Sequence, residues 1–191
     1  LSRLALQSTS DQQDVARYVP IAVAAPMLML PEQAGSWAYP SASMGREETI
    51  TSLSLGLLGR LYLSGYLPQL SHDQLALVRE AVAMHRELRS AIRSLVPRWP
   101  LGLPGWDDSW AAYALTGPEV TLLSVFHRGR GPAEAAVPLS WLLDVPTKME
   151  PVFPREARDW TLEWHPTAAI LNVRAPDSPV SARTVALHTT N

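Results

Sequence analysis

Short apolar runs and longer amphipathic stretches alternate along the first half of the chain. The runs at 4–6, 27–30 and 57–63 predict strands, and the wholly apolar run at 27–30 is typical of a parallel strand buried on both faces. Helical patterns at 15–25 and 47–55 lie between these runs. Strand and helix in alternation predict βα units of a parallel sheet or barrel.

The clearest helical pattern of the chain follows these units. Apolar residues recur at helical spacing from Leu75 to Leu95, and charged residues fall largely on the other side. Ser71 and Gln74 have the spacing of a capping box at its start, and Pro97 ends it. This segment therefore predicts a long amphipathic helix.

The second half of the chain has the pattern of an antiparallel β-domain. The stretch 97–105, rich in proline and glycine, predicts a stiff linker. Alternating or β-branched runs separated by turn signals follow at 110–116, 119–127, 133–139, 160–164, 168–174 and 183–188. We therefore predict two domains, residues 1–96 and residues 97–191, the second being an antiparallel β-sandwich.

Composition narrows the classes of function. The chain is 47% hydrophobic and 18% charged, which is typical of a globular protein. Its net charge of −2 gives no basic surplus, so we expect no nucleic-acid partner. No apolar run approaches the ~20 residues of a membrane span, so we expect no membrane partner. The sequence leaves open whether the chain forms a homo-oligomer.

The absence of cysteine removes several kinds of chemistry at once. Disulfides, thiolate nucleophiles and sulfur-ligated metals are excluded in a chain with no cysteine. The five histidines are scattered, with no pair at the spacing of metal ligands, so we expect no metal site. A cysteine-free chain fits a reducing compartment, and the cytoplasm is the expected location.

Two acidic residues stand where the first predicted strand gives way to a helix. Asp11 and Asp14 lie at this junction, which in βα barrels is the rim where catalytic groups gather. A carboxylic acid whose pKa is raised by burial can act there as a general acid. The simpler interpretation is that both residues cap the following helix. Spacing alone leaves both interpretations open.

Four segments, in order, resemble the motifs of family 36 glycoside hydrolases, the α-galactosidases. Residues 10–17 resemble the S-D-x-x-D-x-x-x-R/Y motif that ends the sixth strand of that family's (β/α)8 barrel. Residues 30–37 resemble its P-E-x-x-G-x-H/W loop after the seventh strand. Residues 56–61 resemble its glycine-containing segment at the eighth strand, and residues 75–82 resemble its closing barrel helix.

The resemblance implies a fold and a reaction. The fold would be the C-terminal part of a (β/α)8 TIM barrel, from the end of strand six to helix eight, followed by an antiparallel β-sandwich. The reaction would be cofactor-free, retaining hydrolysis of an oligosaccharide substrate with terminal α-linked galactose. Asp11 matches the general acid/base, which protonates the departing oxygen and then activates water. This segment does not distinguish α-galactosidases from relatives that act on α-N-acetylgalactosaminides.

The resemblance assigns further residues to the surroundings of the site. Asp14 and Arg17 match positions that hold the loop and helix in place. Glu32, Gly35 and Trp37 fall on the loop beside the sugar ring, where Trp37 would offer an apolar face to the sugar.

Other observations indicate an incomplete site. Residue 1 is not methionine and the chain opens within an element, so we expect the C-terminal piece of a larger protein. The family's nucleophile is an aspartate on the fourth strand, which this chain does not contain. A retaining mechanism needs two carboxyl groups about 5–5.5 Å apart, so we expect the isolated chain to be inactive. Thr9 stands where many relatives carry Trp, which affects fine specificity.

The competing hypothesis is a non-catalytic carbohydrate-binding or assembly module. Trp99, Trp106 and Trp110 surround an acidic pair at 107–108, and such a cluster is compatible with sugar binding. We expect instead that these rings anchor the β-domain on the barrel, because large aromatic side chains bury much area at a domain seam.

Overall fold

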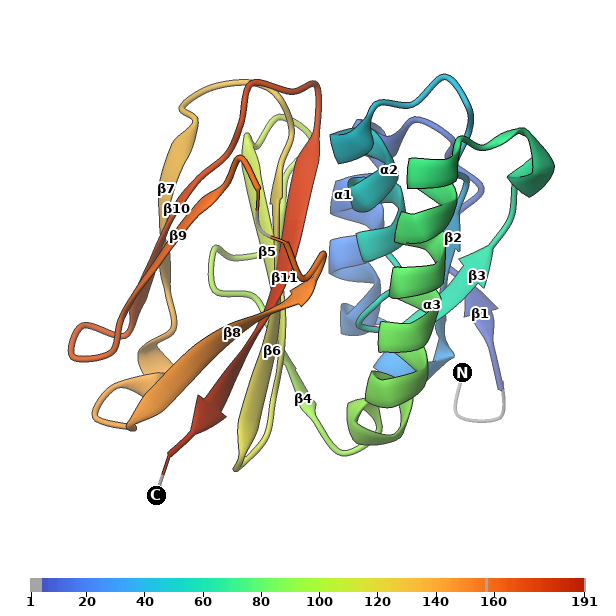
Figure 1. The fold of residues 1–191 in the computed structure, drawn as a ribbon. Coiled ribbons are helices and arrows are strands. Elements are labelled where there is room, and N and C mark those ends of the chain that lie inside the picture. Colours follow the sequence, from blue (N-terminus) through green and yellow to red (C-terminus); the bar gives the residue numbers. More distant parts are fainter. Residues whose placement is uncertain (1–4, 157, 191) are drawn as a thin grey trace.

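Four layers of secondary structure stack from one side of the molecule to the other (Figure 1). The computed structural model describes residues 5–156 and 158–190. A three-stranded parallel sheet comes first and three helices cover one of its faces. A five-stranded antiparallel sheet follows, and a three-stranded antiparallel sheet forms the last layer. Leu4, the first residue of the first predicted strand, lies outside the described residues.

Strand and helix alternate in the first half of the chain, as the apolar pattern predicted, but the first strand lies at Gln7–Ser8 and the prediction of a strand at 4–6 is wrong for the two residues of it that the structure describes. The parallel sheet has the order β1-β2-β3, with β1 at Gln7–Ser8, β2 at Ala34–Ala38 and β3 at Arg60–Leu63. The helices are α1 (Val15–Ala24), α2 (Arg46–Ser54) and α3 (His72–Ile92), with short 3-10 turns η1 (Ala25–Met27), η2 (Pro31–Gln33), η3 (Leu67–Gln69) and η4 (Ser140–Leu142). The described strands form an open sheet and no closed barrel, so the eight-stranded barrel stays a prediction.

The strand predicted at 27–30 is wrong. This run forms the end of a 3-10 turn and the loop after it, and the Leu28 side chain is 72% exposed. Proline on either side of it, at Pro26 and Pro31, lacks the backbone N–H that a central strand needs. The second parallel strand is instead β2, in a stretch that the sequence analysis placed in a loop.

The predicted capping box of the long helix is confirmed. The backbone N–H of Gln74 donates to Ser71 Oγ at 3.2 Å, and the Ser71 N–H donates to Gln74 Oε1 at 2.9 Å. The Gln74 side-chain amide also donates to the carbonyls of Ser41 and Met44, which fixes the loop between β2 and α2 against α3. The helix ends at Ile92, one turn before Leu95.

The predicted antiparallel sandwich is present, with two more strands than the pattern showed. One sheet has the order β4 (Val96–Arg98), β5 (Trp110–Thr116), β6 (Val120–His127), β11 (Ser181–Thr189), β8 (Thr147–Phe153), and the other has the order β7 (Glu134–Pro138), β10 (Ile170–Arg174), β9 (Thr161–His165). The additional strands β4 and β8 lie at the two edges of the larger sheet. Edge strands tolerate proline, which explains how Pro97 and Pro151 fit within them.

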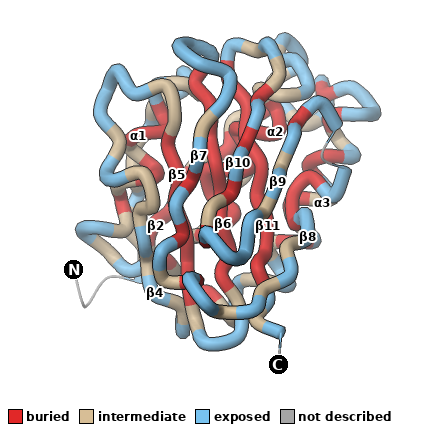
Figure 2. Tube along the Cα trace, turned by 90° about the vertical axis from the view of Figure 1, so that its left-hand side faces the viewer, coloured by how far each residue is buried: buried red, intermediate tan, exposed pale blue. Residues whose placement is uncertain are grey.

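The central strands β5, β6 and β11 of the five-stranded sheet are buried on both faces (Figure 2). Leu123 and Val125 face the smaller sheet, whereas Leu122 and Phe126 face the helices. Because residues from the helices and from this sheet share one core, the two halves of the chain pack tightly together.

Trp99 anchors the β-strands on the helix layer, as predicted. Its Nε1–H donates to the carbonyl of Val23 in α1 at 2.7 Å, and its ring lies 5.9 Å from that of Tyr113. Trp110 packs edge-on against Trp160 inside the sandwich, and Trp106 is 64% exposed. The predicted anchoring is therefore confirmed for Trp99 and wrong for Trp106 and Trp110, and the three tryptophans do not form one sugar-binding surface.

Candidate active site

Asp11 lies at the carboxyl edge of the parallel sheet. It follows β1 by a short loop, and its side chain is exposed. The loop is held by its own polar groups: Ser10 Oγ accepts from the Gln12 N–H at 3.1 Å, and Gln12 Oε1 accepts from the Asp14 N–H at 2.9 Å. Among the described residues no hydrogen-bond donor engages the Asp11 carboxylate. This carboxylate is therefore presented to solvent on a structured turn.

Tyr39 follows β2, the strand that pairs in parallel with the strand preceding Asp11. Burial raises the pKa of the Tyr39 hydroxyl, and the neighbouring Tyr18 and Asp11 raise it further. Tyr39 directly follows β2, so the carboxyl ends of β1 and β2 bring the two side chains to the same edge.

Trp37, Tyr39 and Tyr62 form an aromatic group beside this edge. The Trp37 and Tyr39 rings stack with 6.2 Å between centroids, and Trp37 lies 5.0 Å from the Tyr62 ring on β3. The indole N–H of Trp37 donates to Ser8 Oγ at 2.8 Å, which fixes the orientation of its ring. β2 and β3, with the residue that directly follows β2, thus contribute one aromatic group, and the hydrogen bond to Ser8 ties it to β1.

Gly35 lies within β2, where it allows β1 and β3 to pack closely. A Cβ at this position would lie 2.5 Å from Leu6 Cδ1 and 3.2 Å from Tyr62 Cε2. The residue is therefore part of the packing beneath the aromatic group, and not of a loop as the sequence analysis placed it.

Glu32 lies at the opposite edge of the sheet from Asp11. It belongs to the turn that precedes β2, and it shares a cleft with Gly59 and Arg60 at the amino end of β3. The structure therefore does not bring Glu32 together with Asp11, and we no longer assign it to the site.

Asp14 is the N-cap of α1, as the capping interpretation predicted. Its Oδ1 accepts from the Arg17 N–H at 3.0 Å, and its Oδ2 lies 3.7 Å from Arg17 Nε in an exposed ion pair. Of the two neighbouring aspartates, only Asp14 is occupied by helix capping, which leaves Asp11 for another role.

The sequence analysis missed Tyr18, which joins α1 to two strands. Its hydroxyl accepts from the Trp37 N–H at 2.9 Å and lies 2.6 Å from Thr9 Oγ1. Thr9 Oγ1 donates its own proton to the Gly35 carbonyl at 3.1 Å, so the Tyr18 hydroxyl donates to Thr9. Nothing in the spacing of these residues indicates that they meet.

Tyr18→Phe should destabilise the protein by about 1–3 kcal/mol, because it leaves the Trp37 N–H and Thr9 Oγ1 without their partner. Urea unfolding measures the loss. Tyr66→Phe, at a ring that is 74% exposed, is the control and should leave the midpoint unchanged. Equal midpoints for the two variants would show that the Tyr18 hydroxyl carries no stabilising contact.

The described residues contain neither a cluster of metal-binding side chains nor a membrane-spanning helix. There, no three His, Asp or Glu side chains gather as they would around a metal ion. No helix of the same residues is long and apolar enough to cross a membrane.

Comparison with solved structures gives a clear similarity of fold. The α-galactosidase AgaA from Geobacillus stearothermophilus, as a variant in complex with stachyose, matches 95% of this chain with a TM-score of 0.71 and 14% identity. The galactosidase domain of the α-galactosidase–sucrose kinase AgaSK matches 95% with a TM-score of 0.68 and 15% identity. The α-galactosidase from Lactobacillus brevis matches 95% with a TM-score of 0.60 and 12% identity.

This similarity concerns the fold, since the identities are low. The chain spans 25% of the length of the first two structures and 26% of the third. No family model and no curated protein matches the sequence. The structural resemblance to family 36 glycoside hydrolases that the motifs predicted is confirmed, and the coverage is consistent with a C-terminal portion.

Proposed function

We propose that this chain supplies one side of the active site of a retaining glycoside hydrolase that releases terminal α-linked galactose. The observation that carries the proposal is the position of Asp11, a solvent-facing carboxylate at the carboxyl edge of parallel strands. Enzymes built from βα units place their catalytic groups at this edge. The fold similarity to α-galactosidases supports the same reaction.

Asp11 would act twice in the reaction. As a carboxylic acid it donates its proton to the glycosidic oxygen while the bond from the anomeric carbon to that oxygen breaks. A second carboxylate forms the covalent glycosyl-enzyme. Asp11, now ionised, then takes a proton from the water that attacks the anomeric carbon, and both carboxyl groups return to their starting states.

The aromatic group gives the site a surface that suits a sugar. The half-buried Trp37 ring is held by its hydrogen bond to Ser8 and by stacking on Tyr39. A fixed aromatic face packs against the apolar C–H groups of galactose, whereas a mobile ring would lose entropy on binding. Trp37 is therefore our substrate-binding residue, with Gly35 supporting the strand beneath it.

The second carboxylate has to come from outside this group of strands. Neither β2 nor β3 contains an acidic residue, and Asp14 is engaged as a helix cap. We propose that β1, β2 and β3 are strands six, seven and eight of a (β/α)8 barrel, with residues 1–96 in the barrel and 97–191 in the β-domain. On this proposal the isolated chain hydrolyses no α-galactoside.

The test compares Asp11→Asn with Asp14→Asn in the polypeptide that joins this chain to the nucleophile-bearing strands. Asparagine caps helices as well as aspartate does, so Asp14→Asn should keep activity on raffinose within a few-fold. Asp11→Asn should lose about 10²- to 10⁴-fold, the range of general acid–base catalysis. Nuclear magnetic resonance of the first product should show the α-anomer in the unsubstituted enzyme. Equal rates for the two variants would overturn the proposal.

A further inference from the structure

A buried arginine joins the sandwich to the start of α1. Arg128 directly follows β6, and it is only 4% exposed although it carries a charge. Its Nε–H donates to the carbonyl of Ala16 in α1 at 2.9 Å. Its Nη1 donates to the carbonyls of Gly105 and Asp108, at 3.2 and 3.0 Å, in the loop between β4 and β5. The guanidinium therefore holds α1, this loop and the end of β6 together at one point.

The sequence of α1 explains why this helix takes a donor from outside. In an α-helix the carbonyl of residue 16 accepts a hydrogen bond from the N–H of residue 20. Residue 20 of this chain is Pro20, which lies inside α1 and has no N–H. An unpaired backbone acceptor away from water costs free energy. Arg128 Nε therefore supplies to the Ala16 carbonyl the donor that Pro20 lacks.

The first turn of α1 in turn fixes the loop that carries Asp11. Asp14 caps this turn, since its Oδ1 accepts from the Arg17 N–H at 3.0 Å. The Asp14 N–H donates to Gln12 Oε1 at 2.9 Å, and the Gln12 N–H donates to Ser10 Oγ at 3.1 Å. These contacts involve the residues on both sides of Asp11. A displacement of the first turn of α1 would therefore displace the Asp11 backbone as well.

We propose, on the basis of the proposed function, that Arg128 is a positioning residue for the general acid/base. It holds the first turn of α1 in the position that places Asp11 for proton transfer to the glycosidic oxygen. Arg128 acts through α1 and not by contact with the sugar. The β-domain thereby takes part in catalysis, because the residue after β6 completes the hydrogen bonding of the helix beside the site. The contact lies between two layers that both belong to this chain.

Hydrogen exchange in the 191-residue chain tests the contact without an assay of activity. Arg128→Met removes the donors and keeps a long side chain in place. The amide N–H of Tyr18, which donates to the Asp14 carbonyl at 2.9 Å, should exchange about tenfold faster in this variant, because the first turn of α1 opens more often. Amides in the middle of α3 should exchange at an unchanged rate. An unchanged rate for Tyr18, or the same acceleration in α3, would overturn the proposal.

The rate of hydrolysis is measured in the polypeptide that carries the complete proposed site. Arg128→Met should lower hydrolysis of raffinose by about 10- to 100-fold, because a displaced catalytic group loses much of its effect. The first step with 2,4-dinitrophenyl α-galactoside should be nearly unchanged, because that leaving group needs no proton from Asp11. Equal losses on the two substrates would mean that Arg128 supports the fold in general, and the proposal would be wrong.

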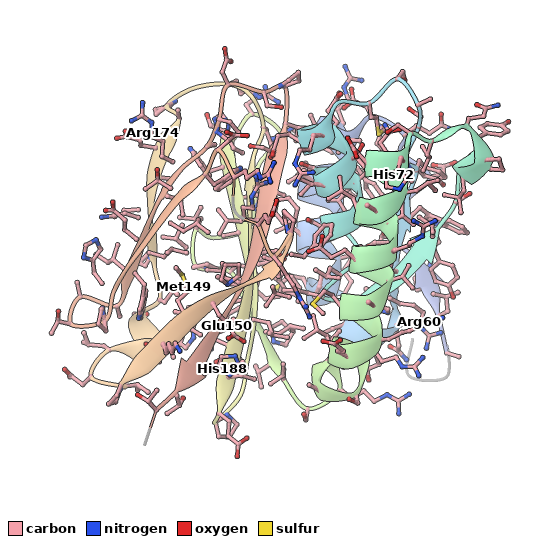
Figure 3. The ribbon with its side chains drawn as sticks, in the orientation of Figure 1. Arg60, His72, Met149, Glu150, Arg174 and His188 are labelled. Carbon is pink, nitrogen blue, oxygen red and sulfur yellow. The ribbon has the colours of Figure 1, made fainter. Side chains whose placement is uncertain are left out.

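Two other arginines give matched controls. Arg130 donates to Asp107 Oδ1 and to the Trp106 carbonyl, at 3.3 and 3.2 Å, so Arg130→Met disturbs the same loop without removing the donor to α1. Arg174 lies on the side of the molecule away from the helices (Figure 3). Both Arg130→Met and Arg174→Met should keep the rate on raffinose. A loss for Arg130→Met as large as that for Arg128→Met would assign the effect to the loop instead of α1.

Pro20→Ala tests whether the Ala16 carbonyl is the point of action. Alanine at residue 20 restores the backbone N–H that can donate to this carbonyl. In the Pro20→Ala background, Arg128→Met should therefore reduce the rate on raffinose by a smaller factor than it does beside Pro20. The same factor in both backgrounds would contradict the proposed role of Arg128.

Asp11→Asn distinguishes a failure of this inference from a failure of the proposed function. If Asp11→Asn loses activity on raffinose and Arg128→Met does not, only the role of Arg128 is wrong. If Asp11→Asn keeps its activity, the proposed function is wrong, and with it any role of Arg128 in the reaction.

Discussion

The loss of hydrolysis rate caused by Asp11→Ala should depend on how good the leaving group of the substrate is. In the polypeptide that contains the complete proposed site, hydrolysis of melibiose should fall by about 10³-fold or more, because its leaving sugar needs the proton that Asp11 supplies. With 2,4-dinitrophenyl α-galactoside the first step should be nearly unchanged, because that leaving group departs as an anion. Burst kinetics should then show the covalent intermediate accumulating, because no base activates water for the second step.

Azide gives this prediction its sharpest control. The azide ion needs no general base, so it should restore turnover of the Asp11→Ala variant on the dinitrophenyl substrate. The product should be α-galactosyl azide, since azide attacks the intermediate from the face where Asp11 stood. A β-galactosyl azide would identify the altered residue as the nucleophile instead. No rescue and an unchanged rate on both substrates would make Asp11 a loop residue without catalytic role.

The position of Glu32 shows how a local error in strand assignment changes a site. Placing the second strand at 27–30 puts Glu32 after a strand, at the edge where Asp11 lies. With the strand at β2, the same residue precedes it and lies at the opposite edge. Asp11 follows β1 and Trp37 lies near the carboxyl end of the parallel strand β2, so the assignment of these two residues to one site stays a prediction compatible with the strand order.

The error had a physical cause. β2 is made of small residues apart from Trp37, and sequence patterns favour β-branched and apolar runs as strands. The small residues Ala34, Ser36 and Ala38 are buried, because helices α1 and α2 pack closely over them. A strand of this composition forms because of the helices and strands that pack against it, and the sequence pattern carries no information about that packing.

The central strands of the sandwich were easier to predict from the sequence than its edge strands. Trp110–Thr116 has the predicted bounds, because a sequence of apolar residues bounded by turns leaves little choice. β8 was missed because it is an edge strand with alternating exposure, a proline and an irregular register opposite Thr184 and Val185. Long-range polar contacts could not be predicted from the sequence pattern. One example is Arg128 Nε, which donates to the Ala16 carbonyl at 2.9 Å although the two residues are 112 positions apart.

A buried ion pair joins the two halves of the molecule, and its loss should be the largest change in stability. Arg183 on β11 donates from Nη1 and Nη2 to the two carboxylate oxygens of Glu47 on α2, at 2.7 and 2.8 Å. The Arg183 side chain is 2% exposed and that of Glu47 is 12% exposed. Two further hydrogen bonds run from Arg183 to the carbonyls of Ala182 and Arg158, and its guanidinium lies 5.3 Å from the Trp160 ring.

Arg183→Met should lower the free energy of unfolding by about 3–5 kcal/mol, because it leaves the Glu47 carboxylate buried without a partner. Guanidinium chloride unfolding, followed by circular dichroism, measures this loss. Arg174→Met removes an exposed arginine whose ion pair with Glu134 spans 3.7 Å, and it should cost at most about 1 kcal/mol. Equal small losses for both variants would contradict a stabilising role of the buried pair.

The double variant Arg183→Met, Glu47→Leu decides what the ion pair contributes. Removing both charges leaves no buried charge unpaired, so this variant should be more stable than Arg183→Met alone, with a coupling energy of about 0.5–3 kcal/mol. Additive losses would mean that the two side chains act separately. Since α2 also packs beneath β2, the pair fixes the sandwich to the helices that support the aromatic group. A loosened Arg183→Met variant should therefore show increased quenching of its tryptophan fluorescence at lower denaturant than Arg174→Met does.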